Sequence, residues 1–290
     1  MIRLAVRVAS AQAELVLAEL LELAPAGVEE GAPAAGIVEY AVYGAPGELP
    51  TLPDLRAAAG DALVEIHTSE VPDDWNERWR EFHRPVLIEA PGRARGESAG
   101  VPSLLVRPPW ENANDALDEH MQEIVIDPGQ AFGTGAHATT RMCLELLLEL
   151  AAAEEARGAM LDVGTGSGVL AIAAAALGFA PVLGLDHDVE SVAAARANAA
   201  VNHAAIEVRR FDLRTQELPA SFPLVLANLL RPLLLELAAK LGNPPADLIA
   251  GGILADELDE VVHAFTSQTS LRERARREQG EWASVWLSAV

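Results

Sequence analysis

The first 70 residues contain short runs in which hydrophobic and polar positions alternate. Three runs have the two-residue period of half-buried strands, IRLAVRV, GIVEYAVYG and DALVEIHTSEV, and one more short strand is expected over residues 27–30. Residues 11–23 and 52–59 instead have apolar residues at helical spacing. The predicted order is βαββαβ, a ferredoxin-like α+β pattern. It contains no catalytic constellation, and such a module more often binds a partner than carries out chemistry.

From residue 85 onward, continuous apolar runs alternate with helical patterns. SLLVRPPW and EIVIDP are interpreted as two strands, and further buried strands are expected over residues 159–163, 182–185 and 224–227 and in DLIAGGIL. Helices are expected from Val169, over VESVAAARANAAVN, and over residues 232–241 and 256–265. The last twenty residues predict two strands that turn at Gly280. This alternation predicts an α/β fold built on a doubly wound sheet.

The segment VPDDWNERWREFHRPV joins the two parts. Its first residues suit the start of a helix, on which Trp75, Trp79 and Phe82 would share one face. Such an aromatic stripe is more typical of an interdomain packing surface than of a substrate cage. The predicted organisation is a small α+β domain over residues 1–70, a linker helix over 71–84 and a catalytic domain over 85–290.

The charge of the chain restricts its partners. The 290 residues carry a formal net charge of -22 and include one lysine, Lys240. Nucleic-acid binding depends on clustered Lys and Arg, so we expect no direct nucleic-acid groove, whereas an acidic enzyme attracts basic partners. Four arginines within residues 272–277 are interpreted as the solvated edge of a strand. No additional apolar face is evident, which favours a monomer.

Several features favour a cytoplasmic protein without a metal site. Cys143 is the only cysteine, so neither an intrachain disulfide nor a cysteine-based zinc site is expected, and the seven histidines lack His-Glu-x-x-His spacing. Arg3 and Arg7 interrupt the N-terminal apolar run, which therefore does not resemble a signal peptide. Residues 163–185 are uncharged, but glycines and Pro181 divide them into loop, helix and strand rather than a membrane span.

The candidate chemistry is concentrated where the strand at residues 159–163 ends. Gly164, Gly166 and Gly168 follow at once, and a helix begins near Val169. Glycines permit positive φ and close approach of a ligand, and a helix N-terminus offers free N–H groups. The dinucleotide fingerprint G-x-G-x-x-G would need its third glycine at Val169, so the pattern is a different one. It indicates a nucleotide-cradling turn, with an ordinary structural turn as the alternative.

A second acidic position supports the nucleotide hypothesis. Asp186 closes the next apolar run, 18 residues after Gly168, where a βαβ unit places an acid that can accept both ribose hydroxyls. Asp188 is the competing candidate, but it suits the N-cap of the next helix. The alternative is that Asp186 only ends a strand. Together with Asp162, two positions before the first glycine, the segment resembles the first motif of class I methyltransferases, which bind S-adenosylmethionine.

A second motif, DPGQAFGTGAHATT, begins at Asp127. Its glycines indicate a loop, and Thr139 and Thr140 lie where a helix begins and can cap it. No Gly-Lys-Ser/Thr follows, so it is not a P-loop. The string AFGTGAHATT resembles a signature of the PrmA family, which methylates ribosomal protein L11. The resemblance is strong over residues 72–290 and only architectural over the first 70, which in that family recognise the substrate.

The resemblance implies a Rossmann-like class I methyltransferase domain and roles for particular residues. S-adenosyl-L-methionine would be the cofactor, and the residues expected to bind it are Thr140, Gly164, Gly166, Asp186, Asn228, Phe132 and Gly133. The last two would line the pocket from the loop that lies over the cofactor. Asp212, which is expected to end the strand RRFD, lies where many class I enzymes hold the adenine amino group, with weaker support from the family.

Asn228 is the residue expected nearest to catalysis. Its amide can offer a carbonyl oxygen to an incoming amine and an NH₂ group to the cofactor, and a structural cap is the alternative. Methyl transfer requires mainly that the nitrogen is held in line with the sulfur–methyl bond. A lysine amine, with a pKa of about 10.4, must first lose its proton, and no dedicated general base is identified. Leu229 and Arg231 depart from the family pattern near the expected substrate mouth, where they could alter specificity without affecting cofactor binding.

The resulting hypothesis is a cytoplasmic S-adenosylmethionine-dependent protein-lysine N-methyltransferase. Its expected substrates are lysine side-chain and N-terminal amino groups of ribosomal protein L11, a basic protein. One alternative is a class I methyltransferase acting on another amine, in a small molecule or a nucleic-acid base, because asparagine at this strand end also occurs in enzymes that methylate bases. A further alternative is a cofactor-binding scaffold that has lost activity.

Overall fold

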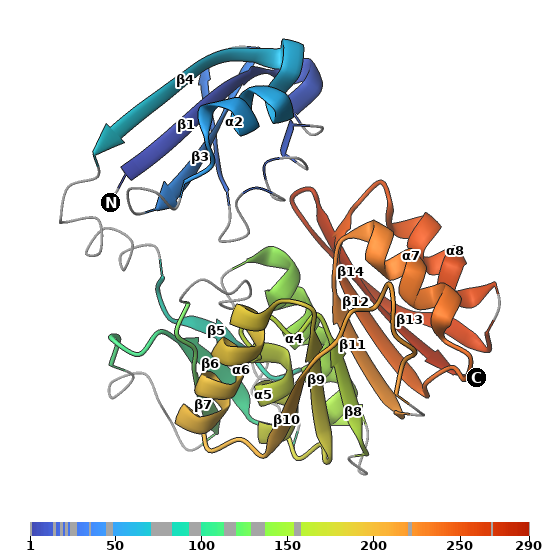
Figure 1. The fold of residues 1–290 in the computed structure, drawn as a ribbon. Helices are drawn as coiled ribbons and strands as arrows, with labels where there is room; N and C mark the ends of the chain where they lie inside the picture. Colours follow the sequence, from blue (N-terminus) through green and yellow to red (C-terminus); the bar gives the residue numbers. More distant parts are fainter. Residues whose placement is uncertain are drawn as a thin grey trace. The chain divides into compact units, whose positions relative to one another are not determined.

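The chain divides into two compact units, Met1–Phe82 and His83–Val290. Figure 1 shows the ribbon of both units. The computed structural model describes residues 2–13, 16–17, 20, 23, 28–34, 36–44, 49–70, 83–92, 100–112, 120–128, 137–153, 158–219, 222–267 and 269–289. The expected linker helix over 71–84 falls almost entirely outside these residues, so it and the proposed domain boundaries stay predictions.

The first unit contains a four-stranded antiparallel sheet. Its strands have the order β2-β3-β1-β4 and are β1 (Ile2–Ala9), β2 (Glu29–Ala34), β3 (Ile37–Gly44) and β4 (Leu63–Glu70). Helix α2 (Leu52–Ala59) begins with a capping box in which Thr51 and Asp54 bond reciprocally. The strands and α2 lie where the periodicity predicted them, although β2 begins two residues later than expected. Residues 11–23 are only partly described, so the ferredoxin-like assignment stays a prediction.

The second unit is built on a seven-stranded sheet with the order β10-β9-β8-β11-β12-β14-β13. The first five strands in this order are parallel, and β14 is antiparallel to both of its neighbours. The strands are β8 (Met160–Val163), β9 (Val182–Asp186), β10 (Ile206–Arg210), β11 (Leu224–Asn228), β12 (Asp247–Leu254), β13 (Leu271–Gln279) and β14 (Trp282–Ala289). The reversal of strand order on either side of β8 is that of a doubly wound fold, as predicted. The arginine-rich strand β13 forms one edge and its arginines are mostly exposed, also as predicted.

Helices cover both faces of this sheet. One face packs against α4 (Ala138–Ala153), α5 (Val169–Ala176) and α6 (Val189–Val201), and the other against α7 (Arg231–Lys240) and α8 (Leu258–Thr266) (Figure 1). The strands alternate between two apolar clusters, as β8 illustrates: Met160 joins the cluster with α4 and α5, whereas Leu161 and Val163 join the cluster with α7 and α8. The five inner strands β8, β9, β11, β12 and β14 are therefore largely buried on both faces, which explains their apolar runs.

A smaller three-stranded sheet precedes the main one. It contains β5 (Val86–Ile88), β6 (Ser103–Arg107) and β7 (Met121–Val125), with β5 antiparallel and β7 parallel to β6. Apolar side chains of all three strands join the core cluster beneath α4 and α5. The two strands predicted in this region are β6 and β7. The end of β7 leads directly toward the loop of the second motif.

The uncharged run at residues 163–185 folds as predicted, into the glycine turn, α5 and β9. Among the helices that the structure describes, none is both long enough and apolar enough to cross a membrane.

Candidate cofactor and substrate site

The glycine turn connects β8 to α5 by a sharp change of backbone direction. Gly164, Gly166 and Gly168 have φ values of 78°, 53° and 84°, a region that side chains other than glycine rarely adopt. Gly168 is the N-cap of α5. The amides of Gly164 and Thr165 both donate to the carbonyl oxygen of Leu185, at 2.8 and 2.9 Å. The turn is thereby fixed against the end of β9, where Asp186 lies.

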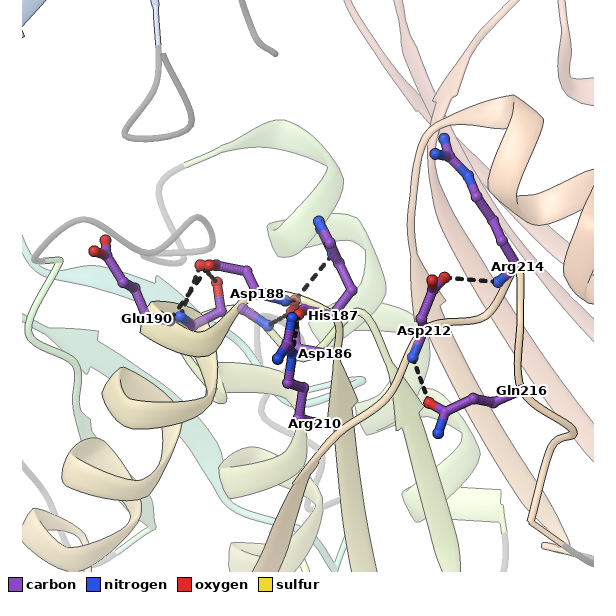
Figure 2. Close-up of polar contacts among 10 residues, drawn as sticks. Asp186, His187, Asp188, Glu190, Arg210, Asp212, Arg214 and Gln216 are labelled. Atoms are coloured by element: carbon purple, nitrogen blue, oxygen red, sulfur yellow. Dashed lines mark hydrogen bonds and ion pairs between the residues drawn. The ribbon is translucent and has the colours of Figure 1, made fainter. Parts of the chain in front are cut away.

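Asp186 holds the glycine turn through its carboxylate. Oδ2 accepts a hydrogen bond from the amide of Gly166 at 2.8 Å, and Oδ1 accepts one from the amide of Asp188 at 3.1 Å. Its side chain is buried, with 8% of the residue exposed. Asp188 caps α6 by accepting from the amides of Glu190 and Ser191, as predicted (Figure 2). Asp186 therefore does more than end a strand, and it also lines an adjacent cleft.

Asp212 lies in the turn after β10 and organises it. Its Oδ1 accepts from the amide of Arg214 at 2.9 Å, and its own amide donates to Oε1 of Gln216 at 2.8 Å (Figure 2). The hydrogen bond from the Arg214 amide is the main cause that lowers the pKa of the Asp212 carboxyl. The expectation that Asp212 ends the strand was wrong: β10 stops at Arg210, because its partner strand β9 ends at Asp186 opposite that residue.

A cleft of about 160 Å³ opens at this edge of the sheet. Apolar, acidic and basic residues share its lining, which is formed by Val163, Gly164, Leu185, Asp186, His187, Phe211, Asp212, Leu213, Arg214, Leu229 and Leu233. Gly164 closes one side under Leu229: a Cβ placed on Gly164 would lie 2.3 Å from Cδ2 of that leucine. The cleft lies at the carboxyl ends of β8 and β9, next to the switch in strand order, where open α/β sheets bind ligands.

Thr140 and Asn228 meet on the other side of the glycine turn. Asn228 is the last residue of β11, and its Nδ2 donates to Oγ1 of Thr140 at 3.2 Å. Thr140 is fully buried. Oδ1 of Asn228 is also buried, and no hydrogen-bond partner for it exists among the described residues. A buried acceptor without a partner costs roughly 1–3 kcal/mol, so a donor supplied by a ligand would be stabilised there.

The threonine pair lies inside the first turn of α4 and not at its cap. The helix begins at Ala138, and Oγ1 of Thr139 is 2.8 Å from Nδ1 of His137. Burial lowers the pKa of His137, whose ring also packs edge-on against Trp282. The expectation that both threonines cap the helix was therefore wrong, because one hydroxyl contacts a side chain of its own helix end and the other contacts β11.

Beneath the glycine turn lies a buried acid, Asp162. Its pKa is raised to about 7, mainly by desolvation and also by the nearby charge of Asp186, whereas the hydrogen bond from the hydroxyl of Thr165 at 2.7 Å opposes the shift. Cys143, on α4, is also fully buried, which raises the pKa of its thiol to about 12. Neither group is part of the cleft lining.

The residues expected to form the site that the structure describes lie in two groups. Gly164 and Asp186 line the cleft, with Gly166 bonded to Asp186, whereas Thr140 and Asn228 form a separate contact. Phe132 and Gly133 lie outside the described residues. Leu229, expected near the substrate mouth, packs on Gly164 within the cleft, and the expectation stays a prediction.

Arg231 and Lys240, two of the chain's cations, are held by other groups. Arg231, also expected at the substrate mouth, forms ion pairs with Glu257 and Glu260, each at 2.9 Å. Nζ of the single lysine, Lys240, donates to backbone carbonyl oxygens of the turn after β10, including that of Arg214 at 3.0 Å. These cations therefore stabilise the fold around the site.

Comparisons with known proteins agree with this geometry. The model of the family described as "Ribosomal protein L11 methyltransferase (PrmA)" matches residues 54–289. A ribosomal protein L11 methyltransferase of Geotalea daltonii is 36% identical over 226 residues, which are 74% of this chain and 67% of the relative. One of Geobacter sulfurreducens is 38% identical over 239 residues, 81% of this chain and 73% of the relative.

A solved structure resembles a large part of the fold. The crystal structure of a ribosomal protein L11 methylase from Lactobacillus delbrueckii subsp. bulgaricus is similar with a TM-score of 0.57 and 33% sequence identity, and the match covers 64% of this chain and 94% of that one. The family match extends over the glycine turn, the cleft and the Thr140–Asn228 contact. The chain therefore belongs to the PrmA family of ribosomal protein L11 methyltransferases.

Proposed function

We propose that this protein transfers methyl groups from S-adenosyl-L-methionine to lysine side-chain and N-terminal amino groups of ribosomal protein L11 in the cytoplasm. Membership of the PrmA family and the names of its relatives support the reaction class and the substrate. The observation that carries the proposal is the buried Oδ1 of Asn228, an acceptor without a protein partner among the described residues. Thr140 holds the amide of this residue, which directly precedes Leu229 of the cleft lining.

The lining of the cleft fits the cofactor. The carboxylate of Asp186 is an acceptor for ribose hydroxyls, and Phe211, Leu213 and Leu229 supply apolar surface for a purine ring. The glycine turn lets the main chain approach the sugar and the methionine portion, because a side chain at Gly164 would meet Leu229. Phe132 and Gly133 would cover the cofactor from the loop of the second motif.

The cofactor supplies a methyl group on a positively charged sulfur, which is a strong electrophile, so the protein needs neither a nucleophile nor a metal. The task of Asn228 is positional: its Oδ1 accepts an N–H of the incoming amine and so directs the nitrogen lone pair. Thr140 fixes the rotation of that amide. Removal of the amine from water favours its neutral form, which is the form that can react.

The charge of the protein supports a basic substrate. A formal net charge of -22 favours association with a cationic protein and disfavours a nucleic-acid groove. The N-terminal unit would recognise and present the substrate, and a linker over residues 71–84 would let one site reach several amines. We propose that the enzyme acts as a monomer.

Transfer of a labelled methyl group tests the proposal. Purified large-subunit ribosomal proteins are incubated with the enzyme and labelled S-adenosylmethionine, with Asp186→Ala as the inactive control, and labelled bands are analysed by mass spectrometry. We expect label on lysines and the N-terminus of L11 that disappears with the mutant. If the cofactor binds but L11 stays unlabelled, the substrate assignment is wrong and another amine substrate must be sought. If the cofactor binds but no amine is methylated, the protein is a binding scaffold.

A further inference from the structure

Two asparagines of α6 bond to the backbone that follows β7. Oδ1 of Asn202 accepts from the amide of Val125 at 2.8 Å, and its Nδ2 donates to the carbonyl oxygen of the same residue at 2.6 Å. One turn earlier, Oδ1 of Asn198 accepts from the amide of Asp127 at 3.0 Å. The helix thus holds the segment from which the loop of the second motif begins.

The spacing of the two asparagines matches the edge that they cover. β7 is an edge strand, and the amide of Ile126 continues its pairing by donating to the carbonyl oxygen of Arg107 on β6 at 2.9 Å. The amides of Val125 and Asp127 therefore point to the opposite side. Residues four apart on a helix are separated by about 6 Å along its axis, close to the roughly 6.6 Å between alternate residues of a strand. The side-chain amides take the place of a neighbouring strand.

Asn198 has a second contact, with the glycine turn. Its Nδ2 donates to the carbonyl oxygen of Ser167 at 2.9 Å, and only 3% of the residue is exposed. The turn also rests on the preceding turn of α6: a Cβ placed on Gly168 would lie 3.1 Å from Cβ of Ala195. One buried amide therefore joins the glycine turn and the start of the second-motif loop, which are separate segments of the chain.

We propose that Asn198 is a positioning residue that holds these two segments at a fixed separation so that both can bind the cofactor. The inference rests on the proposed function, in which both segments contact S-adenosyl-L-methionine. An asparagine meets the requirement because its amide carries an acceptor for Asp127 and a donor for Ser167 on one planar group. Aspartate at this position would keep the acceptor and lose the donor.

Asn202 provides a matched control, because it lies one turn away on the same helix and bonds Val125 but not the glycine turn. We compare Asn198→Ala, Asn198→Asp and Asn202→Ala by calorimetric binding of S-adenosylhomocysteine and by steady-state kinetics. Both Asn198 variants should raise the dissociation constant and the KM for the cofactor roughly tenfold with a smaller change in kcat. Asn202→Ala should change the dissociation constant by less than about twofold, although its loss of hydrogen bonds lowers the melting temperature at least as much.

Hydrogen exchange without cofactor separates coupling from a general loss of stability. In Asn198→Ala the amides of Asp127, Gly166 and Gly168 should all exchange faster, whereas Asn202→Ala should affect only the segment at Val125. Equal effects of the two alanine variants on the dissociation constant, or unchanged exchange at the glycine turn, would overturn the proposal. Binding and exchange require no methyl acceptor, so a failure to methylate L11 would contradict the proposed substrate and leave this result intact.

Discussion

The side-chain amide of Asn228 donates to the hydroxyl of Thr140 across 88 residues of sequence, at 3.2 Å. The contact joins the carboxyl end of β11 to the first turn of α4. It restricts rotation of the side-chain amide of Asn228. Nδ2 is bonded to Thr140, whereas Oδ1 is buried without a partner among the described residues. A proposed role in methyl transfer makes this pair the first target for mutation.

Replacement of Asn228 by alanine should reduce kcat about 100-fold, because a misplaced acceptor amine reacts slowly even when both ligands bind. Thr140→Val keeps the shape of the side chain and removes the hydroxyl, and we expect a loss of about tenfold in kcat. Thr140→Ser keeps the hydroxyl and should remain close to the wild-type rate. Single-turnover methylation with saturating cofactor measures these values, and equal rates for the valine and serine variants would show that the hydroxyl has no part in orienting Asn228.

Asp186→Asn tests the link between the acid and the glycine turn. The carboxylate accepts from the amides of Gly166 and Asp188, so an asparagine must direct an N–H toward one of these N–H groups. We expect the dissociation constant for S-adenosylhomocysteine to rise by about tenfold or more, since hydrogen bonds to charged acceptors contribute about 1.5–3 kcal/mol. Asp188→Asn is the control, because asparagine caps a helix as well as aspartate does. Similar calorimetric affinities for the two variants would exclude a special role for Asp186.

Gly164→Ala combines two effects that a second glycine separates. Gly164 and Gly280 both have positive φ, at 78° and 63°, but a Cβ meets Leu229 at 2.3 Å in the first case and nothing within 4 Å in the second. Gly280→Ala should therefore lower the free energy of unfolding by about 1–2 kcal/mol, the cost of the backbone conformation alone. Gly164→Ala should cost more and weaken cofactor binding.

Urea unfolding of the double variant Gly164→Ala with Leu229→Ala isolates the contact. Removal of the leucine side chain leaves room for the new methyl group, so the two substitutions should be non-additive, and the double variant should be more stable than the sum of the single effects predicts. Strict additivity would mean that the backbone at Gly164 moves away from Leu229 without cost.

The sequence predicts the individual residues of this site better than their contacts. The glycine turn and Asp186 follow from local pattern, because a βαβ unit fixes the distance between its two strand ends. The expectation for Asp212 failed by two residues, since the end of β10 depends on where β9 stops. Thr140 was expected at a helix cap. Its contact with Asn228 could not be predicted, because this partner on β11 is distant in sequence.

Asn198 shows why some residues escape such reasoning. Its helix was predicted, but an asparagine on a helix face has no local feature that identifies its partners, which lie 71 and 31 residues away. Only the packing of α6 against the glycine turn and the edge of β7 brings them together. A pair of asparagines at i and i+4 on one helix is the signal that the sequence offered.

Asp162 should make the stability of the protein depend on pH in an unusual direction. Its pKa in the folded state is about 7, above the unfolded value of about 3.9. Between these values the folded state binds more protons than the unfolded state, so the free energy of unfolding falls as pH rises and then levels off above pH 7. Asp162→Asn cannot ionise and removes this dependence. The stability of the variant relative to wild type should therefore rise by roughly 1–3 kcal/mol from pH 5 to pH 8.

Asp212→Asn is the matched control for this experiment. Its pKa is lowered in the folded state, so Asp212 is ionised in both states from pH 5 to pH 8 and its contribution is lost only at more acidic pH. Denaturant unfolding of wild type and both variants at pH 5, 6, 7 and 8 measures the difference in free energy of unfolding between each variant and wild type. The difference in free energy of unfolding between Asp162→Asn and wild type could instead stay constant over this range. That result would mean that the buried Asp162 is already ionised at pH 5. Thr165 and the N-terminus of α5 would then stabilise its charge more strongly than burial opposes it.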